Sequence, residues 1–457
     1  MNPDAPQLWR APRWALALLL ALLGMLGPFS IDTYLPAFVG MARSLGASPV
    51  QMQQTLSGYL FGFAFMSLFH GAISDSFGRR PVVLWGVAIF TLASAGCALS
   101  QSIGQLVFFR VLQGLCSGAG IVVSRAVIRD MFPPAQAQKV MSTVTIYFGV
   151  APAIAPIIGG WLFVHTGWHS IFWFLIVVGV ALWVANYKLL PETLHLSQRQ
   201  SFEIKGMVRA YWQLGLDPRF LLLALASGIP FNGTFLYTLS SPVFLGEHLD
   251  LAPTQFFWFF VLSIGGIMGG AWFSGRLAGK IEPKRQIRHG FVIMLGAAAI
   301  NLVANLTFKA HVSWALLPIA VFSFGWALMV PVVTLLVLDL NPERRGMASS
   351  LQMFIGSSAN GLVAGVVVPL VMHSTVALAA TSLAMLCVGL VAWTFVHWRW
   401  PADRICLNRR VAQKIASRLL KILKGIYCNF IQLNVKTPVN RAFTRHSQRL
   451  AGRCAGG

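Results

Sequence analysis

The chain has 457 residues, of which 56% are hydrophobic and only 11% are charged, whereas a soluble domain carries about 25% charged residues. This composition excludes an ordinary soluble protein and points to the lipid bilayer. The formal net charge of +22 would suggest nucleic-acid binding in a soluble protein. Here, however, residues 399–457 hold thirteen Lys and Arg against one acid, Asp403. Most other basic residues lie in short loops, which is the positive-inside pattern of membrane proteins, so no nucleic acid is expected as a partner.

The six cysteines provide neither a disulfide framework nor a metal site. Cys97, Cys116 and Cys387 fall inside apolar runs, and the other three lie in the basic tail. No CxxC pair and no pair of histidines accompanies them, so structural disulfides, a bound metal and a cofactor are all unexpected.

Segments of about 18 or more mainly apolar residues are long enough to cross a membrane as helices. We count twelve of them, at 14–38, 51–72, 82–100, 104–126, 140–164, 168–190, 219–244, 254–277, 289–308, 312–338, 347–371 and 375–398. The sequence therefore predicts an all-α polytopic membrane protein. It should comprise a short N-terminus (1–13), two six-helix bundles (14–190 and 219–398), a central loop (191–218) and a basic tail (399–457).

The loops on one side of the twelve segments carry almost all of the Lys and Arg. The other side has only Arg43 and Lys309, so both termini are expected in the cytoplasm. The two halves also echo each other weakly, because Pro28–Tyr34 in the first segment has a counterpart in Pro230–Phe235 in the seventh. Two six-helix halves related by a repeat are typical of secondary transporters, whose substrate sites lie between the halves.

Several motifs follow one another on the expected segments. The turn 71–81 reads Gly-Ala-Ile-Ser-Asp-Ser-Phe-Gly-Arg-Arg-Pro, the fourth segment contains Arg110-Val-Leu-Gln-Gly, and the fifth contains two prolines between glycines at 149–160. Three further stretches, residues 30–36, 125–130 and 190–193, make the match to one family more specific. Together these motifs resemble the major facilitator superfamily, and within it the Bcr/CflA (bicyclomycin-resistance type) drug/proton antiporters. The resemblance covers residues 14–398 and leaves out the tail.

The resemblance implies that the turn 71–81 latches the two halves together when the transporter is open outward. Its expected members are Gly71, Asp75, Gly78, Arg79 and Arg80, together with Arg129. Glycines permit a tight turn and close helix approach, an acid can face a helix N-terminus, and arginines can bind inner-leaflet phosphates. The expected partners of Asp75 are Arg129 and the start of the eleventh segment, around Gly346. In the alternative interpretation Arg79 and Arg80 are topology signals only.

Asp32 and Arg110 are the expected proton-coupling residues. A charged side chain near mid-bilayer is costly and faces a cavity or a partner, and Arg110 lies at a similar depth to Asp32. Burial raises a carboxyl pKa and a nearby cation lowers it, so alternating the two environments makes a proton carrier. The alternatives are a permanent Asp32–Arg110 pair and an Arg110 that only satisfies backbone carbonyls.

The fifth segment should be a kinked, closely packed helix, since prolines kink helices and small residues permit close packing. Its candidate residues, which the resemblance assigns to a seal against proton leak in antiporters, are Gly149, Pro152, Pro156, Gly159 and Gly160. Ordinary small-residue packing is the alternative. The candidates for a substrate cavity are polar or aromatic residues at mid-span: Tyr34, Tyr59, Asn232, Phe235 and Tyr237. Aromatic residues also face lipid, which is the alternative for each of them.

The expected function is multidrug or antibiotic efflux by proton-coupled antiport, from a multi-pass position in the bacterial inner membrane. The expected partners are lipophilic drug-like molecules (bicyclomycin-, sulfonamide- or chloramphenicol-like), protons and anionic lipid, with the chain as a monomer. The alternatives are a metabolite transporter of the same superfamily and a non-transporting receptor; nothing in the sequence supports an enzyme. Met66-Ser67 and Ala72 depart from the family pattern. The pattern of residues 406–427 predicts a basic amphipathic helix on the inner leaflet; the alternatives are a disordered basic extension and an appendage without a role.

Overall fold

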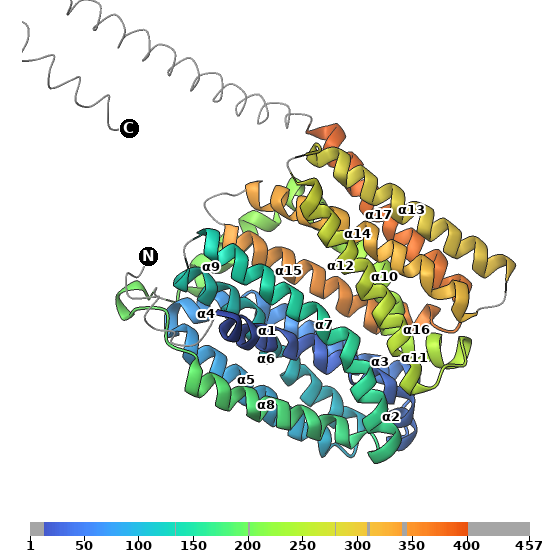
Figure 1. Cartoon of the computed structure of the whole chain (residues 1–457), viewed down its shortest axis with the longest axis horizontal. Helices are drawn as coiled ribbons and strands as arrows, with labels where there is room; N and C mark the ends of the chain where they lie inside the picture. The colour runs from blue at the N-terminus through green and yellow to red at the C-terminus, as the bar shows by residue number, and fades with distance from the viewer. Residues whose placement is uncertain are drawn as a thin grey trace, which may run out of the picture. The chain divides into compact units, whose positions relative to one another are not determined.

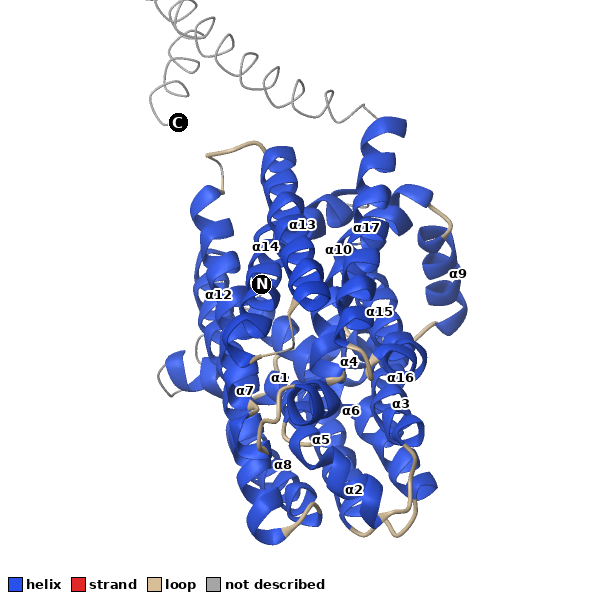
Figure 2. Ribbon diagram, turned by 90° about the vertical axis from the view of Figure 1, so that its right-hand side faces the viewer, coloured by secondary structure: helices blue, strands red, loops and turns tan. Residues whose placement is uncertain are grey.

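The computed structural model describes residues 13–132, 134–199, 202–278, 280–308, 311–340 and 345–400, and every regular element in them is a helix or a helical turn (Figure 2). The N-terminal half comprises α1 Arg13–Asp32, η2 Leu35–Ala37, α2 Phe38–Ser44, α3 Pro49–Ser67, α4 His70–Phe77, α5 Arg79–Ala98, α6 Ile103–Met131, α7 Pro134–Thr166 and α8 His169–Leu189. The connecting segment contains η3 Leu196–Gln198 and α9 Ile204–Gly215.

The C-terminal half repeats the pattern of long helices. It comprises α10 Pro218–Leu239, α11 Ser241–Val243, η4 Phe244–His248, η5 Pro253–Gln255, α12 Phe257–Leu277, α13 Pro283–Thr307, α14 Val312–Leu340, α15 Arg345–Leu362, η7 Val363–Val367, α16 Val368–Val371 and α17 Thr375–Arg399. The segments η4 and η7 are π-helical. Residues from Phe395 onward form a separate unit, of which only the end of α17 and Trp400 are described. The amphipathic helix expected at 406–427 lies outside the described residues.

Ten of the described helices are long and apolar enough to cross a membrane. An eleventh candidate is the pair α3 and α4, which are bent by 48° at a short break. The remaining expected segment, 140–164, lies within α7. The helices therefore fall where the apolar runs predicted them, while the count of twelve spans stays a prediction.

Local sequence signals fix several of the helix starts. Ser48 caps α3, because its hydroxyl accepts the Gln51 amide N–H while the Gln51 side chain accepts the Ser48 N–H, a capping box that satisfies two otherwise unpaired donors. Asp217 caps α10 through one bond, its Oδ1 accepting the Arg219 N–H at 2.9 Å, and Pro218 follows as the first residue of the helix. Proline suits that position because it has no N–H to leave unsatisfied.

Close packing within each half depends on glycines at helix contacts. In the N-terminal half α3 packs on α6, and a Cβ on Gly114 would overlap the Tyr59 carbonyl. In the C-terminal half α12 packs on α14, where Gly266 and Gly270 meet the Ala320 and Phe324 carbonyls in the same way. Small residues allow helix backbones to approach in a membrane, where apolar surface alone provides little drive for helix association.

The two halves lie side by side along α3 and α15 (Figure 1). We call the end that carries Arg79, Arg80, Arg129 and α9 the basic end, and the end where α3 begins and α15 finishes the opposite end. One buried apolar cluster at the opposite end draws on both halves, including Tyr34 and Tyr59 from one and Tyr237 and Phe259 from the other. The buried cluster near the basic end consists of residues of the N-terminal half. The halves therefore share a core at the opposite end.

Candidate functional site

Arg110 lies on α6 in the interior of the N-terminal half and is completely buried. Its Nη1 donates to the Gln113 Oε1 at 2.9 Å and to the Ser30 carbonyl at 3.4 Å. The guanidinium lies over the rings of Tyr34 and Tyr59, with its central carbon 4.7 and 4.4 Å from the ring centroids. Cation–π contacts of this kind are attractive and gain strength where water is excluded.

A second layer of hydrogen bonds holds the residues around Arg110. The Gln113 amide donates to the Ser94 hydroxyl at 2.7 Å, the Tyr34 hydroxyl meets the Thr55 hydroxyl at 2.5 Å, and the Tyr59 hydroxyl donates to the Gly27 carbonyl at 3.0 Å. Among the described residues, the Arg110 Nε and Nη2 have no partner. A buried guanidinium with two unsatisfied donors is costly, so the site is suited to receive an acceptor or an anion.

Asp32 is the last residue of α1 and is buried, with 6% of its surface exposed. Although α1 packs on α6, no hydrogen bond or ion pair joins Asp32 to Arg110 among the described residues. Arg110 instead reaches the backbone of Ser30, which lies two residues earlier and on another side of the helix. The expected partnership of Asp32 and Arg110 is therefore not formed in this conformation.

The turn 71–81 forms a network inside the N-terminal half. The Arg79 side chain is 8% exposed and pairs with Asp75 at 2.5 Å and with Asp130 at 3.0 Å; its Nη1 also donates to the Ser74 hydroxyl. In this conformation Asp75 thus pairs with Arg79 of its own α4–α5 turn, and the latch to Arg129 and the region of Gly346 stays a prediction for the outward-open state. Arg79 is likewise committed to two carboxylates, which corrects the expectation that it binds lipid phosphate.

The acid that caps α5 is Glu192, not Asp75. Its Oε1 and Oε2 accept the backbone N–H groups of Arg79 and Arg80 at 3.0 and 3.2 Å, and Oε1 also accepts that of Leu194 at 3.0 Å. A carboxylate is favoured at a helix N-terminus by the free N–H groups and the helix dipole. Gly78 makes the approach possible, because its φ is +105° and a Cβ there would lie 2.5 Å from the Glu192 Oε2.

This network leads to a stability prediction for Arg79. Arg79→Ala should lower the stability of the detergent-solubilised protein by roughly 1.5–3 kcal/mol, the usual worth of a hydrogen bond to a charged group, because Asp130 loses its guanidinium. Thermal unfolding followed by size-exclusion chromatography measures the loss. Arg80→Ala is the matched control, since within the described residues the Arg80 side chain contacts the Tyr187 carbonyl and ring and no carboxylate. An equal loss in both variants would show that the ion pairs of Arg79 with Asp75 and Asp130 add nothing to the stability of the protein.

The glycine pair in α7 joins different parts of the molecule. A Cβ on Gly159 would overlap the Thr33 carbonyl, next to Asp32, whereas a Cβ on Gly160 would lie 2.7 Å from the Pro253 carbonyl in the other half. Pro152 and Pro156 lie inside the same helix, as does Gly149. The small residues of α7 thus serve one contact within the N-terminal half and one between the halves.

Three hydrogen bonds connect the halves near the opposite end within the described part of the chain. The Gln53 amide donates to the Leu239 carbonyl at 3.1 Å, the Gln54 amide to the Gly365 carbonyl at 3.1 Å and the Ser57 hydroxyl to the Gly361 carbonyl at 2.8 Å. The sequence motifs do not include these residues. Their position could have indicated the contact, since polar side chains within an apolar span usually bond to a neighbouring helix.

The five residues expected to line one cavity are divided between the halves. Tyr34 and Tyr59 are packed around Arg110, whereas Tyr237 and Asn232 are buried in the C-terminal half. The Asn232 amide donates to the Gly228 carbonyl of its own helix, and its Oδ1 lacks a partner among the described residues. Phe235 stacks on Phe231 at 5.2 Å between ring centroids. Tyr34, Tyr59 and Tyr237 nevertheless share the buried cluster at the opposite end, so a common substrate cavity between the halves stays a prediction.

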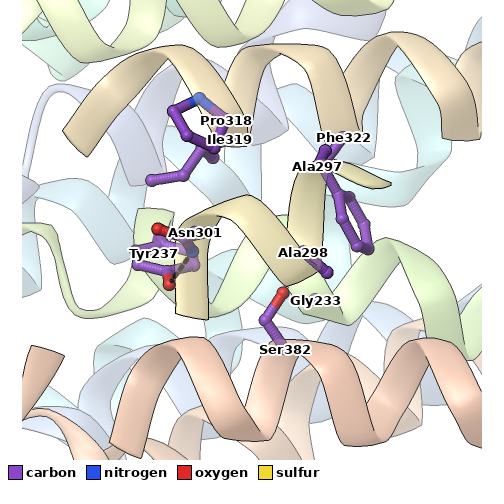
Figure 3. A pocket seen from close by; sticks show the side chains of 9 residues that line it. All are labelled: Gly233, Tyr237, Ala297, Ala298, Asn301, Pro318, Ile319, Phe322 and Ser382. Atoms are coloured by element: carbon purple, nitrogen blue, oxygen red, sulfur yellow. Dashed lines mark hydrogen bonds between the residues drawn. The ribbon is translucent and has the colours of Figure 1, made fainter. Parts of the chain in front are cut away.

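Tyr237 belongs to a small pocket inside the C-terminal half (Figure 3). The lining residues are Gly233, Tyr237, Ala297, Ala298, Asn301, Pro318, Ile319, Phe322 and Ser382. The Asn301 amide donates to the Tyr237 hydroxyl at 2.7 Å. The cavity volume is about 10 Å³, far below the roughly 300–1,000 Å³ of a drug-sized site, so in this conformation the pocket is too small to hold a drug.

Known proteins share the sequence pattern and the fold described above. The sequence profile of the Major Facilitator Superfamily matches residues 20–365. The chain belongs to the Major Facilitator Superfamily. The human organic anion transporter MFSD10 (TETRAN) has a similar crystal structure, with a TM-score of 0.58 and 18% sequence identity, over 85% of this chain and 100% of that one. At that identity the likeness shows the fold alone.

Two bacterial members of the superfamily match most of the chain. A bicyclomycin resistance protein homolog of Haemophilus influenzae is 30% identical over 392 residues, which cover 84% of this chain and 96% of that protein. Multidrug resistance protein D of Escherichia coli is 29% identical over 356 residues, covering 76% and 87% respectively. These relatives confirm the resemblance drawn from the motifs, and with the apolar helices they identify a multi-pass protein of the bacterial inner membrane.

Proposed function

We propose that this major facilitator protein is a secondary active exporter of drugs or antibiotics that exchanges its substrate for protons. One observation carries the proposal of ion coupling. Asp32 and Arg110 are opposite charges, both buried on two helices that pack together, yet neither neutralises the other. A buried charge without a counter-ion is unfavourable, so each group has a reason to take up another partner, a proton at Asp32 and an acceptor at Arg110.

The proposed cycle is alternating access with the basic end in the cytoplasm. That orientation rests on the distribution of Lys and Arg. The core and hydrogen bonds shared by the halves at the opposite end support an inward-facing state, sealed on the periplasmic side. In this cycle drug enters from the cytoplasmic side, and opening of the sealed end gives Asp32 access to periplasmic protons. One proton moving through 100 mV supplies about 2.3 kcal/mol.

A second candidate is the export of an organic anion of metabolic origin. The unsatisfied Arg110 donors favour it, since a guanidinium binds a carboxylate strongly and with defined geometry. The names of the bacterial relatives, a bicyclomycin resistance homolog and a multidrug resistance protein, support drug export as the first choice.

Transport in everted membrane vesicles distinguishes the candidates. The panel is bicyclomycin, a sulfonamide, chloramphenicol and a set of small carboxylates, with a pH-sensitive dye reporting the internal pH. Drug uptake should release protons from acidified vesicles and should stop when an ionophore removes the pH gradient. Proton movement with carboxylates alone favours the second candidate. Substrate and protons moving in the same direction, or uptake that ignores the gradient, would contradict antiport.

A further inference from the structure

Helix α9 differs from the membrane-spanning helices. It has 12 residues, too few to cross a bilayer, which takes about 20. Its exposed apolar residues Ile204, Val208 and Trp212 lie at intervals of four, and Leu216 continues the series beyond the helix end. Residues at that interval share one helix face. The Trp212 side chain is 69% exposed on the protein surface, so this apolar face needs an apolar partner.

The position of α9 indicates what that partner is. The helix ends at Gly215, and the apolar span α10 begins at Pro218. Trp212 therefore lies less than two turns from a helix that enters the bilayer. Lys205 and Arg209 lie next to the apolar stripe on the helix surface and are also exposed. An apolar stripe that includes Trp and adjoins basic side chains is the pattern of a helix lying in the headgroup region of an anionic membrane.

The other face of α9 contacts both halves at the basic end. The Tyr211 hydroxyl donates to the Leu68 carbonyl at 2.9 Å, at the break between α3 and α4. Burial raises the pKa of Tyr211, and the nearby Ser350 hydroxyl on α15 partly offsets this. Leu214 is buried and Gly215 approaches Leu351, which fixes this face against α15.

Tyr211 occupies a defined place in the α3–α15 pairing. These helices run antiparallel, with Ser57 bonded directly to Gly361. Eleven residues further along α3 lies Leu68, and eleven residues back along α15 lies Ser350. At this level α9 joins the two helices, since the Tyr211 phenol bonds to Leu68 and Gly215 packs against Leu351 of α15. Figure 1 shows α9 at the same end of the molecule as α4, beside α15.

We propose that the exposed face of α9 docks on the anionic headgroup surface of the inner leaflet, and that Tyr211 transmits this docking to the ends of α3 and α15. Lipid composition would then bias the separation of the two halves at the basic end. The site takes a phospholipid surface with net negative charge, recognised by Lys205 and Arg209 as charges and by Trp212 as an apolar anchor.

The docking is tested in proteoliposomes of phosphatidylglycerol and phosphatidylcholine, with an NBD fluorophore on a single cysteine. Brominated lipid should quench the label several-fold more strongly at Trp212→Cys than at Gln213→Cys, which lies about 100° around the helix from Trp212 and outside the apolar stripe. Equal quenching would overturn the proposal. So would a disulfide between Trp212→Cys and the tail cysteines Cys406, Cys428 or Cys454, because the tail would then cover the stripe.

The transmission is tested by electron–electron distance measurement between spin labels at Phe77→Cys and Ala278→Cys, without substrate. Adding phosphatidylglycerol to phosphatidylcholine should change the ratio of short to long distances about two- to fivefold, the scale of one or two charges at an anionic surface. The change should disappear in K205Q/R209Q and in Tyr211→Phe, but persist in Thr307→Val, which loses only a bond within its own helix. Persistence in K205Q/R209Q or in Tyr211→Phe contradicts the proposal. The result does not depend on which substrate is exported.

Discussion

Replacing Asp32 by asparagine should abolish substrate-driven proton movement in vesicles while the protein still accumulates in the membrane. Asparagine keeps the size of the side chain but cannot carry a proton, and it removes the cost of a buried carboxylate. We expect proton release to fall to the level of vesicles without the transporter, and thermal stability to stay the same or rise. Exchange of labelled for unlabelled substrate, which needs no gradient, should continue.

Asp250→Asn is the matched control for this variant. Asp250 is exposed and has a φ of +51°, a conformation that asparagine tolerates well, so its replacement should leave both transport and stability unchanged. Substrate-driven proton release that survives in Asp32→Asn would show that another group carries the proton. Loss of exchange along with coupling would mean that Asp32 also contributes to substrate binding.

Adding one methyl group at Gly160 should stop transport by keeping the halves apart at the opposite end. The new Cβ would lie 2.7 Å from the Pro253 carbonyl of the other half, a distance at which backbone atoms have to shift. We expect the distribution of distances between spin labels at Val50→Cys and Leu370→Cys, both exposed near that end, to move to longer values in Gly160→Ala. Substrate transport should fall at least tenfold.

The neighbouring Gly159→Ala variant should behave differently, although the chemical change is the same. Its Cβ would overlap the Thr33 carbonyl inside the N-terminal half, so it should cost about 1–3 kcal/mol of stability through overpacking and leave the spin-label distances unaltered. Gly104→Ala, with no atom near its Cβ, is the neutral control. Equal changes in distance in Gly159→Ala and Gly160→Ala would refute this division of roles.

The sequence predicted the helices well because each long apolar run must satisfy its backbone hydrogen bonds internally in lipid. The sequence did not predict the break between α3 and α4, because neither of the residues there, Leu68 and Phe69, is a helix breaker. The π-helical segments at Phe244–His248 and Val363–Val367 were missed as well. In these places tertiary packing, and not local propensity, determines the backbone.

The candidate site was predicted in its members but not in its contacts. The motifs identified Asp32, Arg110 and Asp75, yet the partners of Arg110 outside its own helix come from two other segments of the chain. The acid that caps α5 is Glu192, more than a hundred residues away. Such pairings depend on how the helices pack together. They produce no local pattern in the sequence from which the contact could be predicted. Polar residues within apolar runs, such as Gln53, Gln54 and Ser57, were the signal available for the contacts between the halves.

The Glu192 carboxylate has a further consequence for movement of the two halves. A single stretch of chain joins them, and the bonds from Glu192 to Arg79, Arg80 and Leu194 fasten its beginning to the N-terminal half. The ion pair between Arg199 and Glu192, at 4.0 Å, extends this attachment, so the connection between the halves is shorter than the distance along the chain from α8 to α10 suggests. A short connection holds the halves at a high effective concentration, so they re-form their contacts quickly after each opening.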